Sequence, residues 1–126
     1  MKVISTREAP AAIGPYSQAV SAKGLLFTSG QSGLIPETGV PAGDTIEVQA
    51  DQCCRNIEAI LKQSGLGFEN VIKTTCFLAD MSDFAVFNGI YAKYFVGKPA
   101  RSCVAVKTLP MGLLCEIEAI AEQSCD

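Results

Sequence analysis

The sequence predicts one α+β domain over residues 1–126, built from a single mixed β-sheet that carries two helices on one face. The length of 126 residues suits one domain with its own hydrophobic core. Two helical patterns alternate with short strand patterns, and no repeat or linker divides the chain. Helices on one face leave the other face of the sheet bare, which indicates that copies of the chain pack together.

The N-terminal part of the chain predicts three strands and a loop. Residues 3–10, "VISTREAP", suit a short first strand, and residues 17–20 and 25–29 predict a hairpin around the turn "AKG". Residues 35–43, "IPETGVPAG", are dense in Pro and Gly and predict a loop.

A first helix is predicted after this loop and before "SGLG" at residues 64–67. Asp44 and Glu47 have the spacing of a capping pair at its start. Apolar or small residues then recur at helical spacing, which predicts an amphipathic helix lying on a sheet. These residues are Ile46, Ala50, Cys53, Ile57, Ile60 and Leu61.

The second half of the chain predicts a strand, a helix and two more strands. Residues 70–80 are β-branched and aromatic, as in a strand. Ser82 is the predicted cap of a helix over residues 83–95, which Gly97 and Pro99 terminate. Its apolar side carries Phe84, Phe87, Tyr91, Tyr94 and Phe95. Residues 101–109 and 113–123 predict strands joined around "LPMG" as another hairpin.

Composition and charge limit the partners. The chain is 48% hydrophobic with a mean hydropathy of +0.27, yet it has no apolar run near the roughly 18–20 residues of a membrane span. We therefore expect no membrane partner and a homo-oligomer that buries the excess apolar surface. The net charge is −3 and the basic residues are scattered, which disfavours a nucleic-acid partner.

The cysteines and the missing histidine limit location and chemistry. The N-terminus lacks the apolar core of a secretory signal, and most of the six cysteines fall on apolar faces, so we expect reduced thiols in a cytoplasmic protein. Without histidine, no Ser-His-Asp triad, Cys-His pair or histidine-based ribonuclease is possible. No common zinc pattern or nucleotide-binding loop occurs, so neither a metal nor an organic cofactor is predicted.

Two charged residues stand inside strand patterns near the C-terminus. Arg101 shares a predicted strand face with Cys103, and Glu116 shares one with Glu118. The arginine fork suits a carboxylate ligand, and a carboxylate in a partly apolar pocket exchanges protons near neutrality. If the hairpin brings Arg101 and Glu116 to one pocket, they indicate binding and hydrolysis of a small anion. The alternative is an ordinary ion pair at a subunit interface.

Four stretches resemble the Rid family of reactive intermediate deaminases, also called YjgF-type, and its RidA-like branch. They are "APAAIGPYSQAV" (9–20), "FTSGQ" (27–31), "VIKTTCFLADMSDFAVFNGIYAKYF" (71–95) and "PARSCVAVKTLPMGLLCEIEAIA" (99–121). The last is the most specific, because its Arg, Cys, Leu-Pro and Glu fall at the family spacing. Two departures are a slightly shorter "VGKP" before Ala100 and Cys115 in place of a commoner aliphatic residue.

The resemblance implies a homotrimer of the chorismate-mutase-like type, whose sheets line a central barrel and whose active sites lie between subunits. It implies a 2-iminobutanoate/2-iminopropanoate deaminase. Enamines released by pyridoxal-phosphate-dependent serine and threonine dehydratases tautomerise to imines, which are hydrolysed to 2-oxo acids and ammonia. No cofactor is implied.

The resemblance also assigns residues by position. Arg101 would clamp the substrate carboxylate, and Glu116 would orient the water and pass a proton to the departing amine. The remaining predicted substrate-binding residues are Tyr16, Ser29, Gly30, Asn88 and Cys103, the last mainly through its backbone.

Two other functions stay open. A non-catalytic trimer that senses small 2-oxo acids would need Arg101 but not Glu116. A ribonuclease or translation inhibitor, a label attached to some relatives, would lack both histidine and a positively charged surface.

Overall fold

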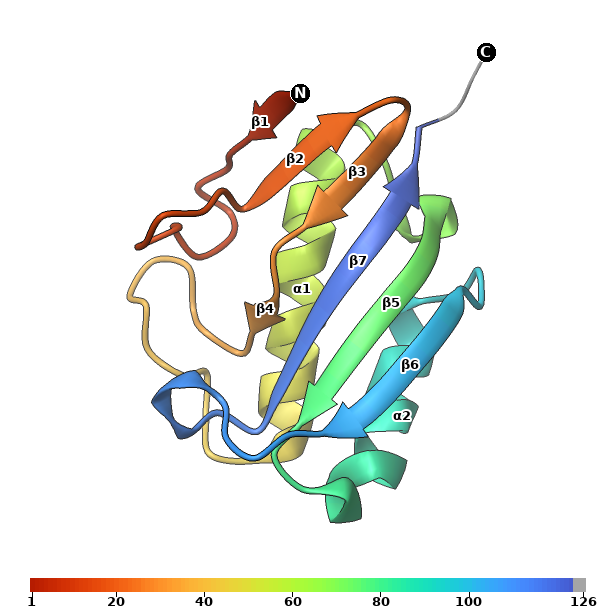
Figure 1. Cartoon of the computed structure of the whole chain (residues 1–126). Coiled ribbons are helices and arrows are strands. Elements are labelled where there is room, and N and C mark those ends of the chain that lie inside the picture. Colours follow the sequence, from red (N-terminus) through yellow and green to blue (C-terminus); the bar gives the residue numbers. More distant parts are fainter. Residues whose placement is uncertain (124–126) are drawn as a thin grey trace.

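The strands form one twisted sheet, with the helices packed behind it (Figure 1). The structure, a computed structural model, describes residues 1–123. The sheet has the order β1-β2-β3-β7-β5-β6, and the short β4 pairs with β7. The strands are β1 (Lys2–Ile4), β2 (Ala19–Ala22), β3 (Leu25–Thr28), β4 (Gln31–Ser32), β5 (Val71–Leu78), β6 (Ala100–Ala105) and β7 (Cys115–Glu122).

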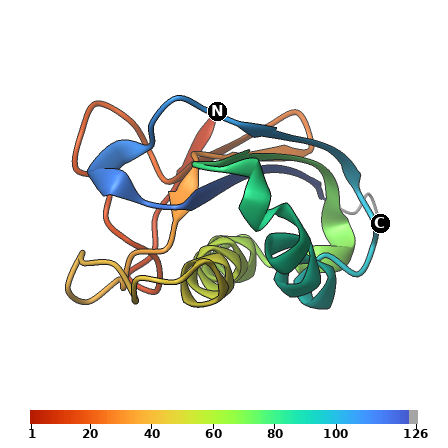
Figure 2. The same ribbon diagram turned by 90° about the horizontal axis from the view of Figure 1, so that it is seen from below.

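Both helices, α1 (Ile46–Gln63) and α2 (Phe84–Tyr94), lie on the same side of the sheet, as the edge-on view of Figure 2 shows. The predicted fold class, an α+β fold with one mixed sheet and two helices on one face, is confirmed. Every residue of the predicted α1 stripe is buried, and the core lies between these helices and the sheet. Apolar spacing alone therefore located the buried face of α1.

The predicted helix caps are wrong at both N-termini. Helix α1 is capped by Thr45, whose Oγ1 accepts a 3.3 Å hydrogen bond from the Val48 N–H, and not by Asp44 with Glu47. Ser82 lies inside a 3₁₀ turn (Met81–Asp83) that runs directly into α2, and Asp80 accepts the Ser82 N–H at 2.8 Å. In both places a neighbouring residue, Thr45 or Asp80, has the extended backbone conformation that a cap requires, and its side chain therefore makes the cap.

The predicted hairpin of the last two strands is wrong, because β5 lies between β6 and β7. Strand β6 runs parallel to β5, and β7 runs antiparallel to it. A parallel pair needs a crossover, which α2 supplies between β5 and β6. Residues 106–114 then carry the chain past β5, so that β7 pairs on its other side with β3 and β4.

Strand β1 is shorter than predicted because side-chain hydrogen bonds hold the segment that follows it. Strand β1 ends at Ile4, and the predicted strand to residue 10 instead becomes a loop held by the buried Gln18. The Gln18 amide donates to the carbonyls of Ala9 and Pro10 and accepts the Thr6 N–H. This loop therefore satisfies its backbone groups without a strand partner. The short β4 was not predicted.

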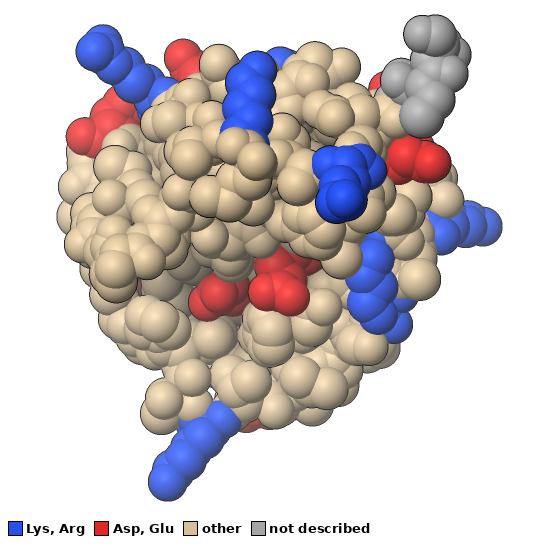
Figure 3. Space-filling model, turned by 45° about the horizontal axis from the view of Figure 1, so that its top comes forward, with Lys and Arg blue, Asp and Glu red and all other residues tan. Residues whose placement is uncertain are grey.

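The sheet face away from the helices is uncovered within one copy of the chain. Phe27 and Val104, which lie on this face, are 38% and 46% exposed. Figure 3, an oblique view of this face, shows acidic side chains in a hollow within largely uncharged surface. Glu118 lines a hollow of about 120 Å³ there together with Phe27.

Candidate active site

Arg101 lies on the helix-bearing face of β6, the edge strand of the sheet. It pairs in register with the buried Thr74 of β5. Its Nη1 donates a 2.6 Å hydrogen bond to Asn88 Oδ1 on α2. The guanidinium carbon lies 4.8 Å from the ring centroid of Tyr91 and 5.6 Å from that of Phe84. One hydrogen bond and two aromatic faces therefore hold the guanidinium, and its other N–H groups have no partner among residues 1–123.

A hollow of about 580 Å³ opens beside this guanidinium. Its wall combines the aromatic rings of Tyr91 and Phe95 with Asn88 and the cations Arg101 and Lys98. Positive charge next to apolar wall suits a small carboxylate with a short alkyl chain. Asn88 was predicted to support the site from the second helix, and the structure places it against Arg101.

Cys103 lies on the same face of β6, one pleat further along, and is half-buried. Burial raises the pKa of the Cys103 thiol, although the positive charge of Arg101 acts in the opposite direction. The thiol is therefore protonated at neutral pH and suits a pocket wall rather than a nucleophile. All five cysteines within residues 1–123 are free, and Cys125 lies outside the described residues.

Glu116 lies on the opposite face of the sheet, in β7, where it pairs with Phe77 of β5. The side chain is half-buried, and its carboxylate has no hydrogen-bond or ion-pair partner in the described part of the chain. Burial raises the pKa of Glu116, and the negative charge of Glu118 raises it further. Such a carboxyl group exchanges protons closer to neutrality than an ordinary glutamate does.

Gly30, just before β4, makes room for the Glu116 side chain. A Cβ on Gly30 would overlap Glu116 Oε1 and lie 2.7 Å from the carboxyl carbon. The pairing of β4 with β7, which sets Ser32 opposite Glu116, brings the two segments this close. Any side chain at Gly30 would therefore displace the carboxylate.

Tyr16 lies in the segment before β2, and Ser29 lies between the end of β3 and Gly30. Tyr16 is 51% exposed and shares with Gly30 the wall of a hollow of about 70 Å³. The Ser29 Oγ donates a 2.6 Å hydrogen bond to the carbonyl of Ser17. Ser29 therefore joins the Tyr16 segment to the end of β3, and its hydroxyl hydrogen is used within the chain.

The structure thus sorts the predicted residues into two half-sites. The Arg101 half-site contains Arg101, Asn88 and Cys103, and the Glu116 half-site contains Glu116, Gly30, Ser29 and Tyr16. Strand β5 separates β6 from β7, and Arg101 and Glu116 point to opposite faces. The expectation that one hairpin brings Arg101 and Glu116 to one pocket is therefore wrong within one copy.

Sequence reasoning missed the residues that support Arg101. It placed Tyr91 only on the apolar side of the second helix and passed over Thr74. The Tyr91 hydroxyl and Thr74 Oγ1 form a buried 2.7 Å hydrogen bond. One signal was present, because Asn88 and Tyr91 are three residues apart and so share a helix face.

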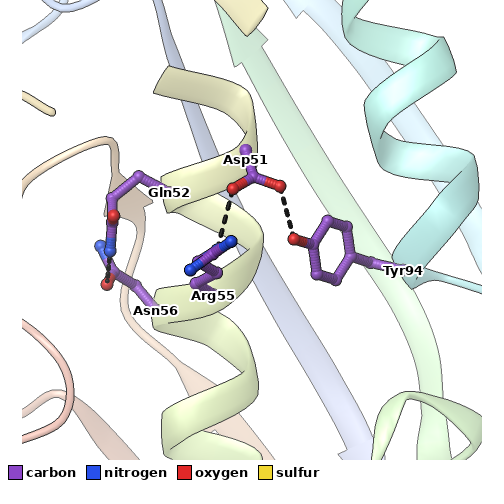
Figure 4. Close-up of polar contacts among 5 residues, drawn as sticks. All are labelled: Asp51, Gln52, Arg55, Asn56 and Tyr94. Carbon is purple, nitrogen blue, oxygen red and sulfur yellow. Dashed lines mark hydrogen bonds and ion pairs between the residues drawn. The ribbon is translucent and has the colours of Figure 1, made fainter. Parts of the chain in front are cut away.

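Two separate sets of polar contacts lie along α1 (Figure 4). Asp51 accepts a 2.8 Å hydrogen bond from Arg55 Nε and a 2.5 Å one from the Tyr94 hydroxyl. Gln52 donates to Asn56 Oδ1 at 2.9 Å. The Arg55–Asp51 pair is exposed, so it contributes at most about 1 kcal/mol. The Tyr94–Asp51 bond joins α2 to α1, whereas the fully buried Asn56 joins α1 to β4.

Within residues 1–123, no helix is long and apolar enough to cross a bilayer. In the same part of the chain, nowhere do three His, Cys, Asp or Glu side chains gather as metal ligands would.

The chain is similar to known proteins in both sequence and structure. The family model described as Endoribonuclease L-PSP matches residues 6–123. The chain is 53% identical to the mouse 2-iminobutanoate/2-iminopropanoate deaminase over 125 residues, covering 97% of this chain and 91% of the mouse protein. It is 52% identical to a RutC family protein of Synechocystis sp. over 96% of this chain and 95% of that protein. The crystal structure of E. coli TdcF with bound serine matches with a TM-score of 0.93 and 42% identity, covering 98% of this chain and 100% of that chain.

Proposed function

Because the chain belongs to the Endoribonuclease L-PSP family, the YjgF-type or Rid family that its sequence resembles, we propose that it hydrolyses 2-iminobutanoate and 2-iminopropanoate to 2-oxo acids and ammonia. The observation that carries the proposal is the Arg101 guanidinium, held by Asn88 and two aromatic rings beside an open hollow. A guanidinium fixed in this way binds a carboxylate through two parallel hydrogen bonds. The deaminase name of the mouse relative supports this substrate class.

The site is completed between copies of the chain in a homotrimer. Arg101 lies on an edge strand, whereas Glu116 lies on the uncovered face of the sheet, so one copy cannot bring both to one substrate. The exposed Phe27 and Val104 supply apolar surface that a partner copy would bury. Three copies in a ring would give three such clefts, each with Arg101 from one copy and Glu116 from its neighbour.

Hydrolysis of the imine needs two proton relays, and Glu116 supplies both. In the first step the water oxygen bonds to C2 and the C=N electron pair moves to nitrogen. Glu116 takes the proton from the water and passes it to that nitrogen. In the second step Glu116 takes the hydroxyl proton of the carbinolamine and gives it to the amine, so that the C–N bond breaks and C=O forms. The raised pKa of Glu116 suits a group that must accept and return a proton in each step.

The family's name points to RNA cleavage, which the composition disfavours. The chain has no histidine to serve as the acid–base pair, and its net charge of −3 gives no grip on a phosphate backbone. We therefore keep a small carboxylate as the substrate. The reaction belongs in the cytoplasm, because buried free thiols such as Cys53 and Cys76 suit a reducing compartment.

The test measures the rate of pyruvate formation while a serine dehydratase generates 2-aminoacrylate in the same reaction mixture. We expect the wild type to accelerate it and Arg101→Ala to lose about 100-fold or more, because a charge-assisted bidentate pair contributes about 3 kcal/mol. Glu116→Gln should lose at least about 100-fold, the contribution of a general acid–base group.

Matched controls are Arg55→Ala and Glu118→Gln, which remove a distant arginine and a neighbouring carboxylate. Both should keep most of the activity. A wild type that binds 2-oxobutyrate through Arg101 without accelerating hydrolysis would be a 2-oxo-acid sensor, and the enzyme proposal would fail.

A further inference from the structure

We infer that Tyr91 is a positioning residue for Arg101: its ring, oriented by the buried Thr74 hydroxyl, holds the guanidinium where it receives the substrate carboxylate. The inference rests on the proposed role of Arg101 and adds a residue whose ring acts through that guanidinium. It concerns how a strand and a helix of one copy prepare the anion-binding half-site before any ligand arrives.

The contact between Tyr91 and Arg101 is the closer of two ring contacts. The guanidinium carbon lies 4.8 Å from the Tyr91 centroid, against 5.6 Å for Phe84, and both distances fall within the roughly 6 Å range of cation–π attraction. Asn88 holds the guanidinium from a third direction with its 2.6 Å hydrogen bond. An arginine side chain with free rotation would have to lose that freedom on binding, whereas this one has lost it already.

The Tyr91 ring is itself fixed at its edge and on a face. Its hydroxyl pairs with Thr74 Oγ1 at 2.7 Å, and Thr74 is fully buried in β5. Its ring stacks on Phe95 with centroids 4.2 Å apart and an interplanar angle of 16°. Thr74 is also the register partner of Arg101, so strand and helix contacts meet at the same guanidinium.

The electrostatics agree with this arrangement. Burial raises the pKa of Tyr91, while the Thr74 hydrogen bond and the positive charge of Arg101 act in the opposite direction. The phenol therefore stays protonated at neutral pH and presents a neutral ring to the guanidinium.

Tyr94 is a matched control on the same helix. It lies three residues after Tyr91 and packs against Phe68. Its hydroxyl donates a hydrogen bond to Asp51, as Figure 4 shows. Its ring makes no cation–π contact with Arg101 among the described residues. Tyr94→Leu therefore removes a tyrosine ring and its hydroxyl bond from α2 without removing a contact of Arg101.

The first readout follows Arg101 directly and needs no ligand. The chain has three arginines, Arg7, Arg55 and Arg101, so Arg101→Lys assigns the Arg101 side-chain N–H signals in an NMR spectrum. We expect these signals to be shifted upfield by the aromatic rings in the wild type and in Tyr94→Leu. In Tyr91→Leu that shift should largely disappear and the signals should broaden.

The second readout is affinity for the product 2-oxobutyrate, with the KM and kcat of the hydrolysis. Tyr91→Leu should weaken binding and raise KM about tenfold, equivalent to about 1.4 kcal/mol, while kcat stays within about twofold. Tyr91→Phe keeps the ring and loses only the Thr74 bond, so about threefold is expected. Tyr94→Leu should leave the affinity within about twofold of the wild type.

The inference is overturned if a folded Tyr91→Leu keeps the Arg101 signals and the affinity of Tyr94→Leu. Should Tyr91→Leu not fold, Tyr91→Phe and Thr74→Val decide: both are expected to move the Arg101 signals, and unchanged signals in both overturn it. A wild type that neither binds 2-oxobutyrate nor hydrolyses imines ends the proposed function, but the NMR comparison still decides whether Tyr91 orders Arg101.

Discussion

The two half-sites differ in how completely one copy of the chain builds them. Around Arg101, Asn88 and two aromatic rings hold the charged group, and a buried hydrogen bond holds the nearer ring in turn. Around Glu116, the carboxylate meets no hydrogen-bond partner within residues 1–123, and the missing side chain of Gly30 only gives it room.

This difference matches the work proposed for each half-site. A carboxylate clamp gains affinity when its guanidinium is fixed in advance, because less conformational entropy is lost on binding. A group that passes protons to and from a substrate must stay able to accept one, and bonds from fixed donors would lower its pKa. In the proposed homotrimer, a neighbouring copy would complete the surroundings of Glu116.

The substitution with the largest expected effect on activity prevents assembly and so separates the two half-sites. Phe27→Asp places a carboxylate on the uncovered face, beside Glu118 in the same hollow. Repulsion and the cost of burying a charge should dissociate the proposed trimer. Hydrolysis should fall at least about 1,000-fold, since each proposed cleft would lose one of its two catalytic groups. Sedimentation velocity measures the assembly, and the Arg101 NMR signals of the monomer should persist.

The matched control is Val86→Asp, on the outer surface of α2, where the side chain is 43% exposed compared with 38% for Phe27. It should remain trimeric and active. Full activity in a monomeric Phe27→Asp protein would show that one copy contains a complete site, and the comparison of the half-sites would collapse.

A smaller test disturbs only the Glu116 half-site. In Gly30→Ala the new Cβ would overlap the Glu116 carboxylate, so the side chain must swing away from its position. We expect kcat to fall about 100-fold, the effect of a shift of about 1 Å in a catalytic group, while 2-oxobutyrate affinity changes little. Rapid-mixing assays give kcat, and calorimetry gives the affinity.

Gly89→Ala provides the control for this substitution. Gly89 lies on α2 with open space around its Cβ position, so alanine there should stabilise the fold by about 0.5–1 kcal/mol and leave kcat unchanged. If both variants lost activity equally, the close approach of Gly30 to Glu116 would have no special role.

The sequence predicted one charged residue of each half-site from its own strand pattern, but not how the half-site is built around it. Arg101 and Glu116 stood out because a charge inside an apolar strand pattern requires a partner or a function. Helical period likewise located the buried face of α1, since that signal is carried by neighbours along the chain. Local pattern was sufficient for this buried face, but not for the helix caps, where adjacent residues compete for the same role.

What joins the residues of a half-site could not be predicted, because it depends on strand order. The placement of β7 between β3 and β5 sets Gly30 against Glu116, although they are far apart in the sequence. The registers of β6 and β7 against β5 put Arg101 and Glu116 on opposite faces, against the expected hairpin. The Thr74–Tyr91 bond crosses from β5 to α2, and the pattern of either element alone does not reveal it.

The smallest expected effect is a change in pH dependence that belongs to one half-site only. In the proposed proton relay Glu116 must be ionised to take a proton from water, so kcat should fall as the pH drops through its pKa. Burial and Glu118 raise that pKa above its usual value, so the fall begins at a higher pH than for an ordinary glutamate.

Glu118→Gln removes the smaller of these two causes and leaves the larger, burial, in place. The acid limb of the kcat profile should therefore move to lower pH while its plateau stays within about twofold, because the acid–base group itself is intact. The affinity for 2-oxobutyrate, set by the Arg101 half-site, should not change. An acid limb that stays in place in Glu118→Gln but disappears in Glu116→Gln would mean that burial alone tunes Glu116. A limb that survives in Glu116→Gln would assign the titration to another group and remove Glu116 from the proton relay.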